Sequence, residues 1–184
     1  KEKRFTGWTD VPLSEKGIKE GLNRIGLVAD KDYLLEIMNA QGDITMLNSF
    51  VDVVATKPFD YVMTTSTPTH QAACRKLTHK TVIFTTVADP VVAGAGKDFT
   101  DHRPNMTGIS TLSDFEGMMR LVKALIPGAD KVGTLYNPSE VNAVVNKESF
   151  DRLLAANGIT LVSVPVNSTS EIGNALESLI AMQI

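Results

Sequence analysis

The sequence predicts an α/β fold with mostly parallel sheets, divided into two α/β units. Strand-like runs alternate with helical runs throughout the 184 residues. Repeated strand–helix units are typical of a parallel sheet with helices on both faces. The alternation starts again after a polar segment without clear periodicity at residues 98–105, which is the best candidate for a boundary between units.

The first unit contains a helix of clear periodicity. Apolar residues recur with helical spacing at Leu13, Ile18, Leu22 and Ile25, and Gly26 would suit a C-terminal cap. The other predicted elements are a weak strand at 4–8, a strand at 33–38, a helix at 44–55, a strand at 60–64, a helix at 69–77, a strand at 81–86 and a short strand at 106–110.

The second unit begins with a helix that ends before Pro127-Gly128. Ser113 and Glu116 fit a capping box, in which the two side chains satisfy free backbone N–H groups. The following elements are a strand at 131–136, a helix at 139–156, a strand at 160–164 and a helix at 170–180. Because two strands make a small sheet with exposed edges, we expect the chain to be truncated at Ile184 or to need a partner.

Composition and motifs exclude several functions. A net charge of −3 argues against a nucleic-acid partner. The single cysteine, Cys74, cannot form an internal disulfide and fits a small core residue. The histidines lack metal-ligand spacing, and no nucleophile elbow or P-loop is present. Gly94-Ala95-Gly96 is only a fragment of a dinucleotide motif, so we expect no metal, no cofactor and no catalytic residue.

Polar residues follow the predicted strands, where ligands bind in open parallel sheets. Thr65, Ser66 and Thr67 lie between a strand and a helix, and free N–H groups at such a helix start attract a carboxylate. The alternative is that Ser66 or Thr67 only caps the helix, and the two roles can coexist.

Four further residues of the first unit are candidates for ligand contacts. Trp8 could stack on a ligand, or could be a partly buried structural residue; Thr9 follows it. Asp10 or Asp89 could balance a ligand ammonium group. Asp89 could instead be a turn residue before Pro90.

The order and spacing of several motifs resemble one known family, the ABC transporter substrate-binding proteins often described as uncharacterised, some of which take aromatic or branched amino acids. The resemblance runs from about residue 8 to residue 179. It rests on Asn39-Ala40-Gln41-Gly42-Asp43, on Thr67-Pro68 with Gln71-Ala72-Ala73, on Val82-Ile83-Phe84 with Asp89-Pro90-Val91, on Asn105-Met106-Thr107-Gly108, and on Val132-Gly133-Thr134-Leu135-Tyr136-Asn137-Pro138 with Asn142.

The resemblance implies a type I periplasmic-binding-protein fold, with two Rossmann-like lobes that close on a ligand like a hinge. It divides the chain into an N-terminal lobe, 1–107, and a partial second lobe, 108–184. It places the candidates of the first unit on one cleft wall, facing Tyr136, Asn137, Glu140 and Asn142. The usual glycine pair before Asn-x-Thr-Gly is replaced by His102-Arg103-Pro104, and the remaining second-lobe strands of the family are absent.

The expected function is therefore reversible capture of a small solute, plausibly an amino acid, without covalent chemistry. The resemblance implies delivery to an ABC permease in the membrane and a periplasmic or extracellular, membrane-anchored bacterial protein. Two alternatives remain open. One is a regulatory sensor such as the effector lobes of LacI-type repressors, and the other is an α/β enzyme, for which we find no convincing nucleophile, base or cofactor site.

Overall fold

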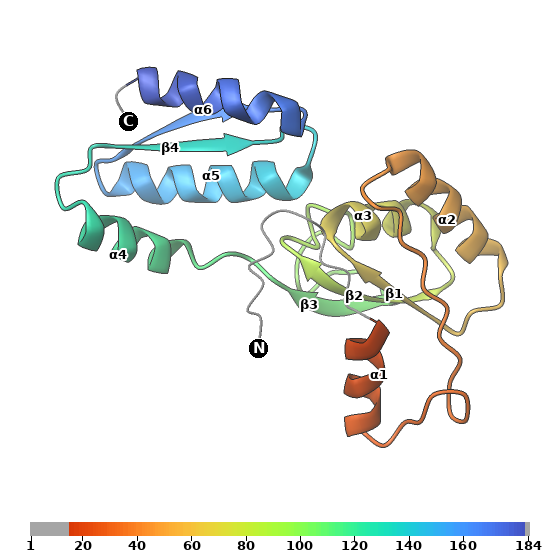
Figure 1. Cartoon of the computed structure of the whole chain (residues 1–184). Helices are drawn as coiled ribbons and strands as arrows, with labels where there is room; N and C mark the ends of the chain where they lie inside the picture. Colours follow the sequence, from red (N-terminus) through yellow and green to blue (C-terminus); the bar gives the residue numbers. More distant parts are fainter. Residues whose placement is uncertain (1–14, 183–184) are drawn as a thin grey trace.

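The computed structural model describes residues 15–182 and shows five strands in two separate parallel sheets, each with helices beside it (Figure 1). This arrangement confirms the predicted α/β fold with parallel sheets. The weak strand predicted at 4–8 and the candidates Trp8, Thr9 and Asp10 lie outside the described residues.

The first sheet contains β1 (Tyr61–Thr65), β2 (Thr81–Val87) and β3 (Met106–Ser110), in the order β1-β2-β3. Strand β2 is central because it pairs with β1 through Val62↔Val82 and with β3 through Val82↔Met106. The larger buried cluster of this lobe joins the sheet to the helices beside it and consists of Leu47, Val51, Ala72, Ala73, Cys74, Leu77, Val82, Ala95 and Met106. Phe84, Val87 and Ala93 form a second, smaller cluster. The predicted core position of Cys74 is confirmed.

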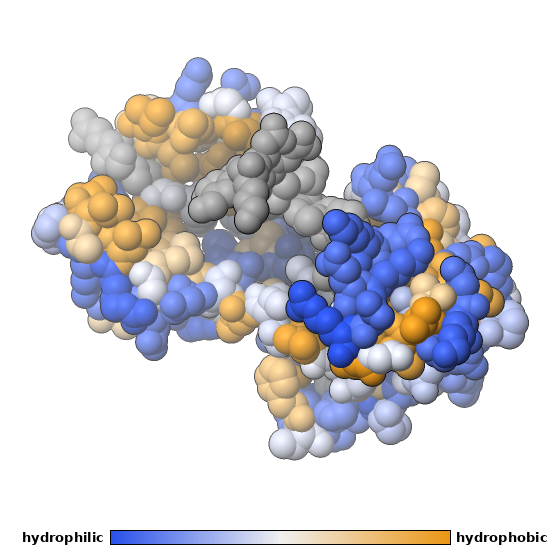
Figure 2. Space-filling view, turned by 60° about the horizontal axis from the view of Figure 1, so that its bottom comes forward, coloured by the Kyte–Doolittle hydropathy of each residue, from blue (hydrophilic) through white to orange (hydrophobic). Residues whose placement is uncertain are grey.

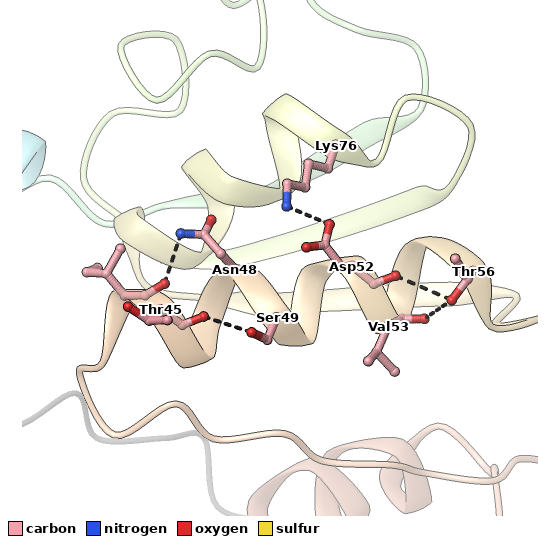
Figure 3. Close-up of polar contacts among 8 residues, drawn as sticks. Thr45, Asn48, Ser49, Asp52, Val53, Thr56 and Lys76 are labelled. Atoms are coloured by element: carbon pink, nitrogen blue, oxygen red, sulfur yellow. Dashed lines mark hydrogen bonds and ion pairs between the residues drawn. The ribbon is translucent and has the colours of Figure 1, made fainter.

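Two helices, α2 (Ile44–Thr56) and α3 (Thr67–Lys76), pack against each other in this lobe. Asp43 caps α2 by accepting a hydrogen bond from the Met46 N–H at 2.9 Å. An ion pair of 2.5 Å between Asp52 and Lys76 joins the two helices (Figure 3). Both side chains of the pair are exposed, so apolar packing contributes more to this contact than the ion pair does.

The N-terminal part of the described chain contributes little to the core. The predicted helix forms as α1 (Glu15–Arg24), but none of its residues is buried. The strand predicted at 33–38 is wrong, because only a single bridge between Ala29 and Tyr33 forms there. No described strand pairs with this segment, and Leu34 stays 87% exposed, so its apolar run has nothing to pack against.

The second sheet consists of β4 (Lys131–Tyr136) and β5 (Thr160–Pro165), which pair in parallel. Helices α5 (Val141–Ala156) and α6 (Ile172–Ala181) lie on opposite sides of it, and η1 (Thr169–Glu171) leads into α6 (Figure 1). The helix α4 (Phe115–Leu125) packs on α5. The core is small and contains Met119, Phe150, Leu154 and Ile159.

The predicted capping box at α4 is wrong, although the helix itself is confirmed. The helix begins at Phe115, so the N-cap is Asp114 and not Ser113. The Asp114 carboxylate accepts a hydrogen bond from the Gly117 N–H at 2.8 Å. A side chain one residue later than expected therefore satisfies the free donor of the first turn.

The second lobe exposes apolar side chains on its outer helices. Each strand of its sheet has one neighbour and one open edge. Figure 2 shows apolar surface on this left-hand lobe, and the exposed apolar residues of α4 and α6 include Met118, Leu121, Leu125, Ile172, Leu176 and Ile180. The expectation of a small second sheet with exposed edges is thus met. In the described part of the chain, no helix combines the length and the apolar character needed to span a bilayer.

Candidate functional site

The turn between β1 and α3 holds a strained backbone. Ser66 has φ 87° and ψ 153°, a region that non-glycine residues rarely adopt, at a cost of about 1–3 kcal/mol. Its N–H donates to the Thr85 carbonyl at 3.2 Å, and its hydroxyl lies 3.1 Å from that of Thr69. Strain of this kind is kept mainly at functional sites, which supports a ligand role for this turn.

The hydroxyls of this turn differ in what they contact. Ser66 occupies the N-cap position of α3, but its side chain caps no backbone N–H. Thr67, only 3% exposed, accepts a hydrogen bond from the Ala88 N–H at 3.3 Å. Thr65, half-buried, ends β1. Capping alone therefore does not account for Ser66, and the first turn of α3 keeps the free donors of a helix start.

A buried histidine packs beside this turn and contacts the end of β1. His70 is fully buried, and its Nδ1 lies 3.3 Å from the Thr64 hydroxyl at the end of β1. Its ring lies 4.5 Å from the ring of Phe84, between centroids. Burial, aided by the Arg103 charge, lowers the pKa of His70 to about 4. The imidazole is therefore neutral at pH 7, and links α3 to β1 without a buried charge.

Asp89 has the geometry of the turn residue that was the alternative prediction. Its Oδ1 accepts hydrogen bonds from the N–H groups of Val91 at 2.9 Å and Val92 at 3.1 Å. This carboxylate oxygen is therefore already used within its own turn. A role of Asp89 in ligand binding stays a prediction.

Three of the four second-lobe candidates, Asn137, Glu140 and Asn142, form one hydrogen-bond network at the start of α5. The Glu140 carboxylate accepts from the amide of Asn137 at 3.3 Å and from the amide of Asn142 at 3.4 Å. Tyr136 ends β4, and the Lys147 ammonium lies 5.5 Å from its ring centroid. The structure thus brings all four predicted residues of this lobe to one end of its sheet.

Sequence reasoning missed Asn146, which lies one helical turn beyond Asn142. The side-chain oxygens of both residues are buried and lack a hydrogen-bond partner. Buried carbonyl oxygens are normally paired, so these two are acceptors available to a donor. The four-residue spacing of the two asparagines on α5 was the signal that could have found it.

A contact between two helices joins the turn at Ser66 to the hydrogen-bond network at Glu140. Helix α3, which starts at the strained turn, touches α5, which starts at the asparagine–glutamate network.

Two open hollows, of about 750 Å³ beside α1 and about 350 Å³ around residues 94–103, lie elsewhere in the described chain. Neither is lined by a predicted ligand residue. Within residues 15–182, no three or more His, Cys, Asp or Glu side chains are grouped so that they could hold a metal ion.

Comparison with protein families gives one match over most of the chain. The family described as ABC transporter substrate binding protein matches residues 11–182. A tyrosine-binding protein of Clostridioides difficile (strain R20291) is 31% identical over 168 residues, covering 91% of this chain and 46% of that protein.

Two solved structures show the same fold. A Streptococcus pneumonia ABC domain in complex with L-Trp has a TM-score of 0.83 at 28% identity, covering 90% of this chain and 56% of that chain. A ligand-free, open substrate-binding protein from Clostridium difficile has a TM-score of 0.65 at 27% identity, with 89% and 56% covered. The present chain thus superposes better on the tryptophan complex than on the open protein.

Short matches to enzymes also occur. Two 2,3-bisphosphoglycerate-dependent phosphoglycerate mutases, from Parabacteroides distasonis and Elusimicrobium minutum, match over 34 and 58 residues. These matches cover 14% and 22% of the enzymes, which is too little to show that family. The chain spans about half the length of the substrate-binding relatives that it matches.

Proposed function

Because the chain belongs to the family of ABC transporter substrate-binding proteins, we propose that it captures an amino acid between its two lobes, for delivery to an ABC permease in the membrane. The ligand class follows the relatives, one of which is a tyrosine-binding protein and another a complex with L-Trp. We therefore place aromatic amino acids first and branched ones second. The protein would act by reversible binding, without catalysis.

The strained turn at Ser66 is the observation that carries the proposal. In this assignment Thr65, Ser66 and Thr67 hold the ligand carboxylate with hydroxyl and backbone donors at the start of α3. The turn is held in an unfavourable backbone conformation by buried contacts, as binding turns commonly are. Such preorganisation lowers the ordering cost of binding.

The second lobe would supply acceptors for the ligand ammonium. Glu140 carries a negative charge, and the side-chain oxygens of Asn142 and Asn146 are buried and unpaired. A ligand ammonium group has three N–H donors, and these oxygens would accept hydrogen bonds from them. Asp10 and Asp89 stay alternatives for the same charge, and Trp8 and Tyr136 would enclose the ligand side chain, with Thr9 and Asn137 beside them.

The chain is more similar to a ligand complex of this family than to an open, ligand-free relative. The TM-score is 0.83 against the tryptophan complex and 0.65 against the open, ligand-free relative, over similar shares of the chain. By family, we place the protein outside the cytoplasm, in the periplasm or anchored at the outer face of the membrane, with no nucleic-acid partner.

Isothermal titration of the chain against a panel of amino acids tests this proposal. We expect L-tyrosine or L-tryptophan to bind, and Glu140→Gln to weaken that binding at least about tenfold, through the loss of one charged acceptor. Glu177→Gln on exposed α6 is the matched control and should bind as the parent does. Silence across the panel, or equal losses in both variants, would contradict the proposal.

A further inference from the structure

The larger of the two open hollows lies beside α1, away from both proposed ligand walls. Helix α1 forms one side of it, and the turn at residues 27–33 forms the other. Its volume of about 750 Å³ is in the range of small-molecule sites. We propose that this hollow binds a small neutral molecule with an apolar body and a hydrogen-bond acceptor.

A buried hydroxyl without a partner marks this hollow. Tyr33 is one of its lining residues, and the Tyr33 Oη is buried and has no hydrogen-bond partner. Native proteins rarely leave a buried polar atom unpaired, so the hydroxyl is a donor available to a ligand oxygen. The Lys19 side chain, which also lines the hollow, is long and 42% exposed, and it can move aside to admit that oxygen.

The charges around the hollow cancel. The Lys19 ammonium lies 2.6 Å from the Glu15 carboxylate, and the Lys16 ammonium lies 3.8 Å from the Glu20 carboxylate. All four side chains lie on α1 and line the hollow. Because each charge has a partner, none is left to balance a charged ligand, whose transfer from water would be unfavourable. The hollow therefore favours a neutral ligand over the zwitterionic amino acids proposed for the interlobe site.

The turn opposite α1 is ordered and exposes apolar side chains. The Val28 N–H donates to the Asp32 carboxylate at 2.9 Å, and the Asp30 N–H donates to the Tyr33 carbonyl at 2.9 Å. Leu27 and Val28 line the hollow and are 38% and 45% exposed, so an apolar ligand would remove them from water. A turn that is already ordered lowers the cost of binding.

The test is a fluorescence titration of the chain with prodan, a neutral naphthyl ketone whose emission shifts to the blue when it leaves water. Its ring system and carbonyl oxygen match the proposed ligand class. We expect one molecule of prodan per chain, which L-tryptophan does not displace. Dansylate, an anion with the same ring system, should bind at least about tenfold more weakly. Displacement of prodan by L-tryptophan would place the dye in the interlobe site and overturn the proposal.

Tyr33→Phe removes the hydroxyl and keeps the ring. It should weaken prodan binding at least about fivefold, through the loss of one hydrogen bond. Because the hydroxyl is unpaired in the free chain, its loss should leave the urea midpoint of unfolding unchanged or raise it. Tyr61→Phe, at a tyrosine of β1 that is 70% exposed, is the matched control and should change neither quantity.

A second variant separates the hollow from other apolar surfaces that could take up the dye. Val28→Asp introduces an unbalanced charge at an exposed position of the hollow, and should weaken prodan binding at least about tenfold. Leu176→Asp, on the exposed face of α6, is its control and should bind prodan as the parent does. Absent binding, equal affinities of the parent and Tyr33→Phe, or equal losses in Val28→Asp and Leu176→Asp would overturn the proposal.

Discussion

Both lobes consist of a parallel sheet with helices beside it, but they differ in how much apolar surface they bury. In the first lobe, β2 has a neighbour on both edges and nine residues form the buried core cluster. In the second lobe, both strands have an open edge, four residues form the cluster, and α4 and α6 expose apolar side chains. The turns that follow the strands are therefore stabilised in different ways in the two lobes. The turn at Ser66 follows a buried polar contact between Thr64 and His70, whereas Glu140 is held by the part-buried side-chain amides of Asn137 and Asn142.

The largest effect should come from emptying the smaller core. Leu154 is fully buried at the centre of the second lobe, so Leu154→Ala should cost about 3 kcal/mol through lost contacts and a cavity. Hydrogen exchange should show faster exchange in α5 and β5, with β2 little changed. Leu176→Ala, at a half-exposed position of α6, is the control. Equal loss of protection in both lobes would show that they unfold as one unit.

A second test measures how the stability of the first lobe depends on acid pH. The pKa of His70 is lowered from 6.5 to about 4, so the unfolded chain takes up a proton in this range that the folded chain does not. Stability should therefore fall as the pH drops from about 6.5 to about 4, by up to about 3 kcal/mol, and then level off. Urea unfolding at several pH values measures it. His70→Leu should remove this component, and an unchanged pH profile in the variant would contradict it.

Relief of strain at the ligand turn should give a smaller effect of opposite sign. Ser66→Gly removes the side chain that makes φ 87° unfavourable, so the free energy of unfolding should rise by about 1 kcal/mol. Urea denaturation measures this difference. Ser113→Gly, at an exposed residue with no positive φ, should instead be neutral or slightly destabilising. A destabilised Ser66→Gly would mean that the hydroxyl contact with Thr69 outweighs the strain.

An effect of similar size distinguishes the observed cap of α4 from the predicted one. Asp114→Ala should destabilise the second lobe by about 1 kcal/mol, because the Gly117 N–H loses its acceptor. Ser113→Ala should have little effect. Thermal unfolding of the two variants side by side measures the difference, and the reverse order would restore the capping box predicted from the sequence.

Sequence periodicity predicted most elements because their neighbours are close in the chain. The strands Met106–Ser110 and Lys131–Tyr136 have the predicted bounds. The helix predicted from residue 69 starts at Thr67, since Pro68 is tolerated in a first turn. The strand predicted at 33–38 failed because a strand needs a partner that no local pattern supplies. The division into lobes at residues 107 and 108 stays a prediction, and it falls inside β3.

The candidate site was predictable in its residue types but not in its geometry. Hydroxyls at a strand end marked the turn at Ser66, yet its backbone strain has no sequence signature. Asn137, Glu140 and Asn142 were found by motif, whereas the unpaired oxygen of Asn146 needed the structure. The contact between Cys74 and Met106 joins residues 32 positions apart, a separation that only the parallel sheet explains.

The most direct test of the account is a nitrogen-15 chemical-shift map of the chain with and without L-tyrosine or L-tryptophan. We expect the largest shifts to occur together at residues 65–69 and 136–146, on two lobes that share one ligand. Shifts confined to one lobe, or centred on the hollow beside α1 while both turns stay unchanged, would contradict it.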